Sequence, residues 1–272
     1  MNTPSLKAGT EKVIEHFLAE KLRKIGATGF VLGVSGGIDS AVVLRLAANA
    51  IGPEKVMALV LPEEDSSEED TQDAVELCKG VGVEYRVIDI SGVVQALTAA
   101  ITDRADQKSL ANIKARVRMI LLYHYAATEG RLVLGTSNKS ELLIGYFTKY
   151  GDGGADLEPI GDLYKTQVRQ LAVALGIPEK IVQKVPTAGL WPGQTDENEI
   201  GMKYEDLDSV LMSIELALDV KAASQRTGIS ESEIERVAKM VRSSSHKRKF
   251  PPTVKIGLRT PGLDWREGDE DF

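Results

Sequence analysis

The sequence predicts an α/β fold in which a doubly wound, mainly parallel sheet is flanked by helices. Short apolar runs alternate along the chain with segments whose apolar residues recur every three or four positions, as strands alternate with helices in such folds. The short runs are almost continuously apolar, which is typical of strands covered on both faces. A turn rich in glycine and serine follows the first run, at the strand end where open parallel sheets bind ligands.

Each predicted element has a simple signature. The expected strands are the apolar runs 29–34, 55–62, 84–90 and 131–136. The expected helices have apolar residues at helical spacing and span residues 11–25, 38–50, 68–79, 92–101, 106–128, 138–145, 165–175, 204–217 and 231–242. The apolar side of the first helix consists of Val13, Ile14, Phe17, Leu18 and Leu22. Gly52 and Pro53 end the second helix, and glycine-rich loops precede the helices that begin at residues 165 and 204.

Helix 106–128 is long and has apolar residues on more than one side. Its main apolar stripe consists of Leu110, Ile113, Val117, Ile120, Leu121 and His124. The apolar residues beside this stripe are Ala111, Met119, Leu122 and Tyr123. His124 is therefore expected in the core, and the residues beside the stripe are consistent with a second buried face.

Composition and charge limit the class of protein. The net charge of -7 argues against a general nucleic-acid-binding surface. No segment approaches the roughly 20 apolar residues of a membrane span, and the N-terminus lacks a signal-peptide pattern. A cytoplasmic protein without membrane contact is therefore expected. The single cysteine, Cys78, allows no internal disulfide and is expected to pack in the core.

Much of the negative charge is local. Residues 62–73 hold seven carboxylates and are expected to form a loop that continues into a solvated helix N-terminus. Residues 261–272 hold five carboxylates and are expected to form a disordered tail after a single domain over residues 1–260. His16 is expected to be structural or exposed, and Trp191 and Trp265 are assigned no role.

The turn SGGIDS over residues 35–40 joins the first strand to the second helix. Its glycines allow backbone N–H groups to approach an anion, the helix N-terminus adds positive potential, and the serine hydroxyls add donors. The turn matches neither the Walker loop nor the glycine pattern of dinucleotide-binding folds. A phosphate-binding turn is therefore favoured over a turn that only caps the helix.

The motif S-G-G-x-D-S after the first strand resembles the PP-loop of the ATP pyrophosphatases, which have a Rossmann-like fold of the adenine nucleotide alpha hydrolase type. Three further stretches resemble ammonia-dependent NAD synthetases, namely LGTSN to VRQLA over residues 134–172, VPTAG to YEDLD over 185–208 and SSHKRKFPP over 244–252. Longer glutamine-dependent members carry an extra nitrilase-like domain with a catalytic cysteine. This sequence offers no room for that domain, and Cys78 is poorly placed for the role.

The resemblance implies a carbon–nitrogen ligase that catalyses the last step of NAD biosynthesis. The nicotinate carboxylate of deamido-NAD attacks the α-phosphate of ATP and releases pyrophosphate. Ammonia then attacks the adenylated carbonyl, and AMP leaves. Mg²⁺ is implied as the cofactor and ATP as the co-substrate, since a metal would neutralise the leaving pyrophosphate.

The resemblance also implies roles for individual residues. The implied ATP-binding residues are Ser35, Gly36, Gly37, Ile38, Asp39, Ser40, Thr136, Lys165 and Thr187. The implied Mg²⁺ ligands are Asp39 and Glu141, and the implied deamido-NAD-binding residues are Arg116, Lys149, Asp156, His246 and Lys247. The implied catalytic residues are Asp39, Lys165 and Asp156. Other members have a polar residue at position 38, so Ile38 is expected to contribute only its backbone.

The residue types alone leave simpler explanations open. Asp39 and Thr136 could each cap a helix, and Glu141 could be a solvated helix residue. The other simple explanations are a surface position for Lys165, an ordinary loop hydroxyl for Thr187 and a solvated basic patch for residues 246–249.

The resemblance further implies a homodimer through the helices near residues 106–128, with the deamido-NAD site close to that interface. Two other functions stay open, namely another PP-loop enzyme of the GMP synthetase or tRNA-modifying type, and a nucleotide-binding module without turnover. The sequence does not decide whether ammonia arrives free or from a separate glutaminase.

Overall fold

The fold is known from a computed structural model that describes residues 3–101, 106–191, 193–258 and 260. Four strands form a parallel sheet in the order β3-β2-β1-β4. The strands are β1 Phe30–Gly33, β2 Val56–Val60, β3 Glu84–Val87 and β4 Leu132–Leu134. Because β1 pairs in parallel with both β2 and β4, the carboxyl ends of these strands meet at one edge of the sheet. The predicted α/β fold is confirmed.

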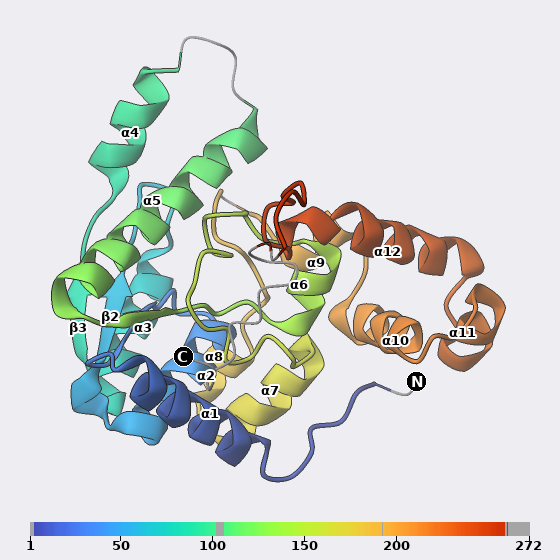
Figure 1. Cartoon of the computed structure of the whole chain (residues 1–272), viewed down its shortest axis with the longest axis horizontal. Coiled ribbons are helices and arrows are strands. Elements are labelled where there is room, and N and C mark those ends of the chain that lie inside the picture. Colours follow the sequence, from blue (N-terminus) through green and yellow to red (C-terminus); the bar gives the residue numbers. More distant parts are fainter. Residues whose placement is uncertain (1–2, 102–105, 192, 259, 261–272) are drawn as a thin grey trace.

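Helices cover the sheet and extend beyond it (Figure 1). The helices from the first half of the chain are α1 Thr10–Ile25, α2 Ile38–Ile51, α3 Glu68–Val81, α4 Ser91–Ala99 and α5 Gln107–Glu129. Those that follow β4 are α6 Lys139–Ile144, α7 Lys165–Ala174, α8 Glu179–Val182, α9 Asp196–Ile200, α10 Tyr204–Glu215, α11 Val220–Thr227 and α12 Glu231–Ser243. Short 3₁₀ turns span Pro53–Lys55 and Ser245–Lys247.

The sheet separates two hydrophobic cores, because successive side chains of a strand point to opposite faces. Phe30 and Leu32 of β1 face a core built with α1, α2, α3 and α7, whereas Val31 between them faces a core built with α5. A third cluster joins α6 to α10, α11 and α12, which form a lobe beside the sheet (Figure 1). β1 and β2 are thus covered on both faces, as their continuous apolar runs predicted.

The edge strand β3 departs from the prediction that every strand is buried. It lies outermost in the sheet and pairs with β2. Glu84 and Val87 are exposed, and Tyr85 and Arg86 are half-buried. An edge strand has a neighbouring strand on one side only, so its apolar residues receive less cover than those of a central strand.

The long helix α5 is covered on more than one side, as expected, because Val117 of the main stripe and Ala111 beside it are both buried. Ala111, Ala115 and Ala126 are buried, whereas Ile120 is 58% exposed and His124 is also exposed. The predicted core position of His124 is therefore wrong. Small side chains let the helix backbone approach its neighbours closely, so the alanine face packs inward and part of the larger apolar stripe stays at the surface.

The remaining predictions for the fold divide clearly. Cys78 is fully buried, as expected, and burial raises the pKa of its thiol to about 12. His16 is exposed, and so is Val13, because the buried side of α1 is centred on Ile14 rather than on Val13. Trp265 and the predicted acidic tail lie outside the described residues. Within the described part of the chain, the helices lack the combination of length and apolar character that crossing a bilayer requires.

Candidate functional site

A cavity of about 630 Å³ opens beyond the carboxyl ends of the strands. Its lining comes from the ends of β1, β2 and β4, from α5, and from the loops over residues 145–154 and 184–191. All the site residues predicted from the sequence line this cavity, except Gly36 and Asp156. The structure therefore brings together residues that are far apart in the chain.

The turn at residues 35–40 keeps its shape through hydrogen bonds between its own members. The hydroxyl of Ser40 donates to the Gly37 carbonyl at 3.0 Å and accepts from the Ser35 N–H at 3.2 Å. The Gly37 N–H lies 3.3 Å from the Ser35 hydroxyl, and no described side chain caps the N-terminus of α2. Open N–H groups at a helix N-terminus attract anions, so the turn is suited to phosphate.

Gly36 and Ile38 support the turn from behind. Gly36 has φ +80°, and a Cβ at this position would clash with the Asp70 carbonyl of α3. The Ile38 side chain is buried in the hydrophobic core, and Ile38 also borders the cavity. This packing explains why an apolar residue is tolerated at position 38.

Asp39, Lys165 and Glu141 form a buried charged cluster at the cavity. The ammonium of Lys165 lies 2.5 Å from Asp39 Oδ2 and 3.3 Å from Glu141 Oε1. Asp39 Oδ1 also accepts a hydrogen bond from the Asn138 amide at 3.0 Å. The carboxylate of Asp39 is thus directed across the site, rather than being used as a cap for its own helix.

The other simple explanations for these residues fail as well. Asn138, not Thr136, caps α6, and Glu141 completes that capping box. Lys165 is buried rather than at the surface, as the first residue of α7. Burial acts to lower the pKa of Lys165, but Asp39 and Glu141 outweigh burial and raise that pKa, so the lysine remains charged.

Two residues beside this cluster were not predicted. The Tyr204 hydroxyl donates to Asp196 at 3.1 Å and lies 3.5 Å from Glu141. Asp196 lines the cavity, and its buried Oδ1 has no hydrogen-bond partner among the described residues. Burial raises the pKa of Asp196, while Lys165 opposes that shift. Asp196 belongs to the acidic stretch QTDENE, which could have indicated a polar site. Nothing in that stretch distinguishes Asp196 from its acidic neighbours.

A second group of basic residues lines the cavity at the loop 145–154 and at residues 246 and 247. The Arg116 guanidinium donates to the Lys149 carbonyl at 3.3 Å, and the Lys149 ammonium donates to the His246 carbonyl at 3.0 Å. The Lys247 ammonium donates to the carbonyls of Gly145 and Phe147 at 2.6 and 2.7 Å. The basic run is therefore tied to the protein and is not merely a solvated patch.

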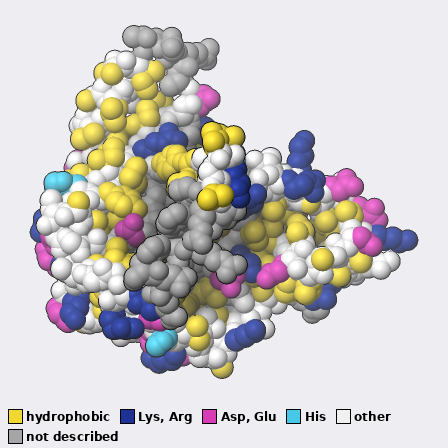
Figure 2. All heavy atoms as spheres, viewed as in Figure 1, with side chains coloured by type: hydrophobic (Ala, Val, Ile, Leu, Met, Phe, Trp, Pro, Cys, Tyr) yellow, Lys and Arg dark blue, Asp and Glu magenta, His cyan; other side chains and the backbone are white. Residues whose placement is uncertain are grey.

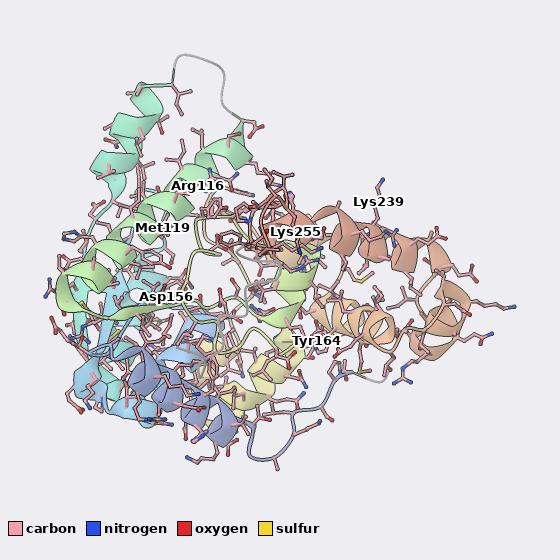
Figure 3. All side chains as sticks on the ribbon, viewed as in Figure 1. Arg116, Met119, Asp156, Tyr164, Lys239 and Lys255 are labelled. Atoms are coloured by element: carbon pink, nitrogen blue, oxygen red, sulfur yellow. The ribbon has the colours of Figure 1, made fainter. Side chains whose placement is uncertain are left out.

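Asp156 takes a different position. One carboxylate oxygen accepts from the Tyr123 hydroxyl at 3.1 Å, and the other accepts from the Val133 N–H at 2.8 Å. In Figure 3 it lies beneath α5, whereas Arg116 and Met119 lie along that helix. The structure thus joins Asp156 to β4 through Val133, and Asp156 itself does not line the cavity.

Comparisons with known proteins agree with this geometry. The profile of the family described as NAD synthase matches residues 10–251. An NH3-dependent NAD+ synthetase from Hyperthermus butylicus is 48% identical over 246 residues, which cover 90% of this chain and 89% of that protein.

Two solved structures are also similar. The NMN synthetase from Francisella tularensis has a TM-score of 0.81 and 36% identity, with 91% of this chain and 98% of that one covered. The NH3-dependent NAD synthetase from Campylobacter jejuni has a TM-score of 0.77 and 34% identity, with 90% of this chain and 97% of that one covered. The likeness extends over nearly the whole length of each protein.

Proposed function

The chain belongs to the NAD synthase family, and on that premise we propose that it converts deamido-NAD to NAD by ATP-dependent amidation with ammonia. The reaction releases AMP and pyrophosphate, and the enzyme is a carbon–nitrogen ligase. One observation carries the proposal, namely that the open phosphate-binding turn shares a single cavity with the cluster of Asp39, Lys165 and Glu141.

The first half-reaction follows from the chemistry of the carboxylate. A carboxylate is a poor electrophile, so adenylation must supply a leaving group. A nicotinate oxygen attacks the α-phosphorus of ATP, and the bond to the pyrophosphate oxygen breaks. The N–H groups of the turn receive the phosphates, Lys165 adds a fixed positive charge, and Thr136 and Thr187 add hydroxyl donors. These groups orient the reactants and stabilise the charge that develops.

The carboxylates of Asp39 and Glu141 fit a Mg²⁺ ion. Both contact the same cation, Lys165, so they converge on one point at the cavity. In the described part of the chain, no three acidic, histidine or cysteine residues are grouped to hold a metal. Mg²⁺ in phosphate sites takes one or two carboxylates together with phosphate oxygens, so two carboxylates are sufficient. When bound, Mg²⁺ would neutralise part of the negative charge on the departing pyrophosphate.

The second half-reaction needs the adenylated nicotinate to be held still while ammonia attacks its carbonyl carbon and AMP departs. Arg116, Lys149 and His246 are assigned to the anionic and hydroxyl groups of deamido-NAD. Lys247 is assigned to the same substrate and also fixes the turn at residues 145–147 through its two carbonyl contacts. Asp156 is assigned to deamido-NAD from the side of α5, since it lies outside the cavity.

A homodimer through α4 and α5 is part of the proposal. Figure 2 shows hydrophobic side chains gathered over these two helices. The exposed large hydrophobic residues of the two helices are Val93, Leu97 and Ile120, and Ile101 just after α4 is exposed as well. A continuous apolar face of this kind is typical of a protein–protein interface. A second copy on this face would also lie beside Asp156. We further propose a cytoplasmic enzyme with one domain over residues 1–260.

A second substrate is worth testing because one similar structure is that of an NMN synthetase. The carboxylate form of NMN has the same nicotinate group and lacks the second nucleotide. It would need the same turn and the same Lys165 cluster. The two substrates differ in how much of the basic end of the cavity they would occupy.

The test mixes purified protein, MgATP, ammonium and either deamido-NAD or the carboxylate form of NMN. Equal amounts of AMP, pyrophosphate and NAD from deamido-NAD support the proposal. AMP without NAD or NMN points to another PP-loop activity, and ATP binding without products points to a module without turnover. Replacing ammonium by glutamine should abolish product formation by the protein alone.

A further inference from the structure

The acidic run over residues 63–73 has no role in the mechanism described so far. The sequence predicted solvated carboxylates, but four of them are paired with two lysines. Lys114 lies 2.6 Å from Glu63 and 2.7 Å from Asp65. Lys184 lies 2.5 Å from both Asp70 and Asp73. Glu63 and Asp73 are buried, so these pairs are not ordinary surface contacts.

Lys114 connects three parts of the molecule. It belongs to α5 and is only 7% exposed. Besides Glu63 and Asp65, its ammonium donates to the Leu190 carbonyl at 2.8 Å. Burial acts to lower the pKa of Lys114, but Asp65 and Glu63 outweigh it and raise the pKa. All three hydrogens of the charged ammonium thus have an oxygen within hydrogen-bonding distance.

Lys184 makes a similar connection at the other end of the same segment. Its ammonium pairs with Asp70 and Asp73 of α3 and lies 3.4 Å from the Gly36 carbonyl of the phosphate-binding turn. Lys184 and Lys114 therefore fasten residues 184 and 190 to the same acidic run. Both lysine contacts lie beside the cavity, since Lys184 and Leu190 line it.

Little else fixes the chain between these two points. Val185, Thr187, Ala188 and Gly189 are all exposed, and Thr187 lines the cavity. The other hydrogen bonds here are local. The Gly189 N–H donates to the Thr187 hydroxyl at 3.0 Å, the Asp196 N–H donates to the Pro186 carbonyl at 3.0 Å, and the Leu190 N–H donates to Gln194 at 2.8 Å. A segment with few buried apolar contacts depends on its polar anchors for a defined position.

We propose that Lys114 and Lys184 are positioning residues that fasten segment 184–190 to the acidic run and so hold Thr187 in the wall of the ATP site. The acidic run then provides the surface to which this segment is attached. The inference rests on the proposed function, because that function assigns Thr187 to ATP. Neither lysine needs to touch a substrate.

Trp191 offers a direct reporter, since it follows Leu190 and lines the cavity. The chain has two tryptophans, so Trp265→Phe leaves Trp191 as the only tryptophan, whose emission is excited selectively at the red edge of the absorption band. In this background Lys114→Met should raise acrylamide quenching of Trp191 about twofold without any nucleotide, because the segment loses an anchor. The matched control is Lys139→Met. Lys139 also has two carboxylate partners, Asp162 and Glu215, but lies outside the cavity lining.

Kinetics separate positioning from general damage. Lys114→Met should raise the KM for MgATP about tenfold and leave the KM for deamido-NAD within about twofold. Lys114→Arg, which keeps the charge, should recover part of the ATP affinity. Because Lys114→Met leaves Glu63 buried without its cation, the double variant Lys114→Met with Glu63→Gln provides a better-folded version of the same test.

Three results would overturn the inference. The first is unchanged Trp191 quenching in Lys114→Met and in the double variant Lys114→Met with Glu63→Gln. The second is an equal increase in quenching in Lys139→Met. The third is an equal rise in the KM values for MgATP and deamido-NAD. A failure of the proposed function is distinguishable, because it appears as absence of NAD formation by the unaltered protein. The quenching measurement uses no substrate and still reports on the anchoring.

Discussion

The two walls of the proposed ATP site are built in opposite ways. The turn at residues 35–40 is held by hydrogen bonds between residues at most five positions apart. The segment 184–190 is held by contacts that span 76 positions from Leu190 to Lys114 and 114 positions from Lys184 to Asp70. The shape of the first wall is therefore set locally, although Asn138, Lys165 and Lys184 also contact it from distant parts of the chain. The anchors of the second wall form only when distant parts of the chain have assembled. The comparison separates what a motif encodes from what the fold must supply.

The largest expected effect comes from Asp39→Asn, which alters chemistry at the local wall. We expect kcat/KM to fall about 100- to 1,000-fold, because the charge that faces Lys165 and the proposed Mg²⁺ is lost. Thermal stability should change little, since Lys165 keeps Glu141 as a partner. Product formation and thermal unfolding measure the two effects. The control is Asp162→Asn, which removes an exposed carboxylate outside the cavity. An equal loss of activity and stability would make Asp39 a structural residue.

Gly36→Ala tests the point where the two walls meet. The added Cβ would require an unfavourable positive φ and would clash with the Asp70 carbonyl. We expect a loss of about 2 kcal/mol in the free energy of unfolding and weaker ATP binding. Denaturant titration and nucleotide binding are the measurements. Gly80→Ala in α3 is the control, because its Cβ meets nothing within 4 Å and should not destabilise the protein. Normal stability of Gly36→Ala would show that the turn can shift at low cost to avoid the clash with Asp70.

Glu158 lies between the two cases in sequence separation. It accepts a hydrogen bond from the Ser137 N–H at 3.2 Å, and the two residues are 21 positions apart. Burial raises the pKa of Glu158 to about 8 from its ordinary value of 4.5. Between these values the folded protein keeps a proton that the unfolded chain has released, so stability falls as pH rises through this window. The slope is at most about 1.4 kcal/mol per pH unit. Glu158→Gln should flatten it in denaturant titrations between pH 5 and 8. An unchanged slope would mean that another group is responsible.

The smallest expected effect is that of Ser67→Ala. Ser67 caps α3 at the start of the helical part of the acidic run, and it accepts a hydrogen bond from the Asp70 N–H. Its loss should cost about 1 kcal/mol of stability. The KM for MgATP should remain unchanged, because both lysine anchors stay in place. Ser230→Ala, which removes the equivalent cap of α12, should have the same effect on stability. A rise in the KM for MgATP in Ser67→Ala but not in Ser230→Ala would mean that the acidic run needs the Ser67 cap to hold segment 184–190.

The predictability of the molecule follows the same division. The order of strands and longer helices could be predicted, because apolar periodicity is written in consecutive residues. The short helices α8, α9 and α11 were not predicted, since their four to eight residues contain few apolar positions. The equally short α6 was predicted within the stretch that resembles NAD synthetases. The burial of Ala115 and Ala126 on α5 could not be predicted for another reason. Alanine contributes little to a hydrophobic stripe, yet it permits the closest approach.

The site divides in the same way. The turn at residues 35–40 could be identified from its glycines and serines, and the cavity gathers nearly all the residues that the resemblance implied. The partners of the acidic run could not be predicted, because a row of carboxylates does not specify which distant lysine it meets. The isolated Oδ1 of Asp196 and the position of Asp156 beneath α5 likewise depend on the tertiary fold. Charge and hydrogen-bonding capacity are visible in a sequence, whereas pairing is not.

The long sequence separation between the turn and the lysines that contact it has a consequence for synthesis of the protein. The ribosome releases the turn early, but the lysine that pairs with Asp39 follows 126 positions later, and the one that reaches Gly36 follows its glycine by 148. A nascent chain therefore exposes half of a nucleotide site for most of its synthesis. The two lysines that complete the proposed site therefore reach the turn only after most of the chain has been synthesised.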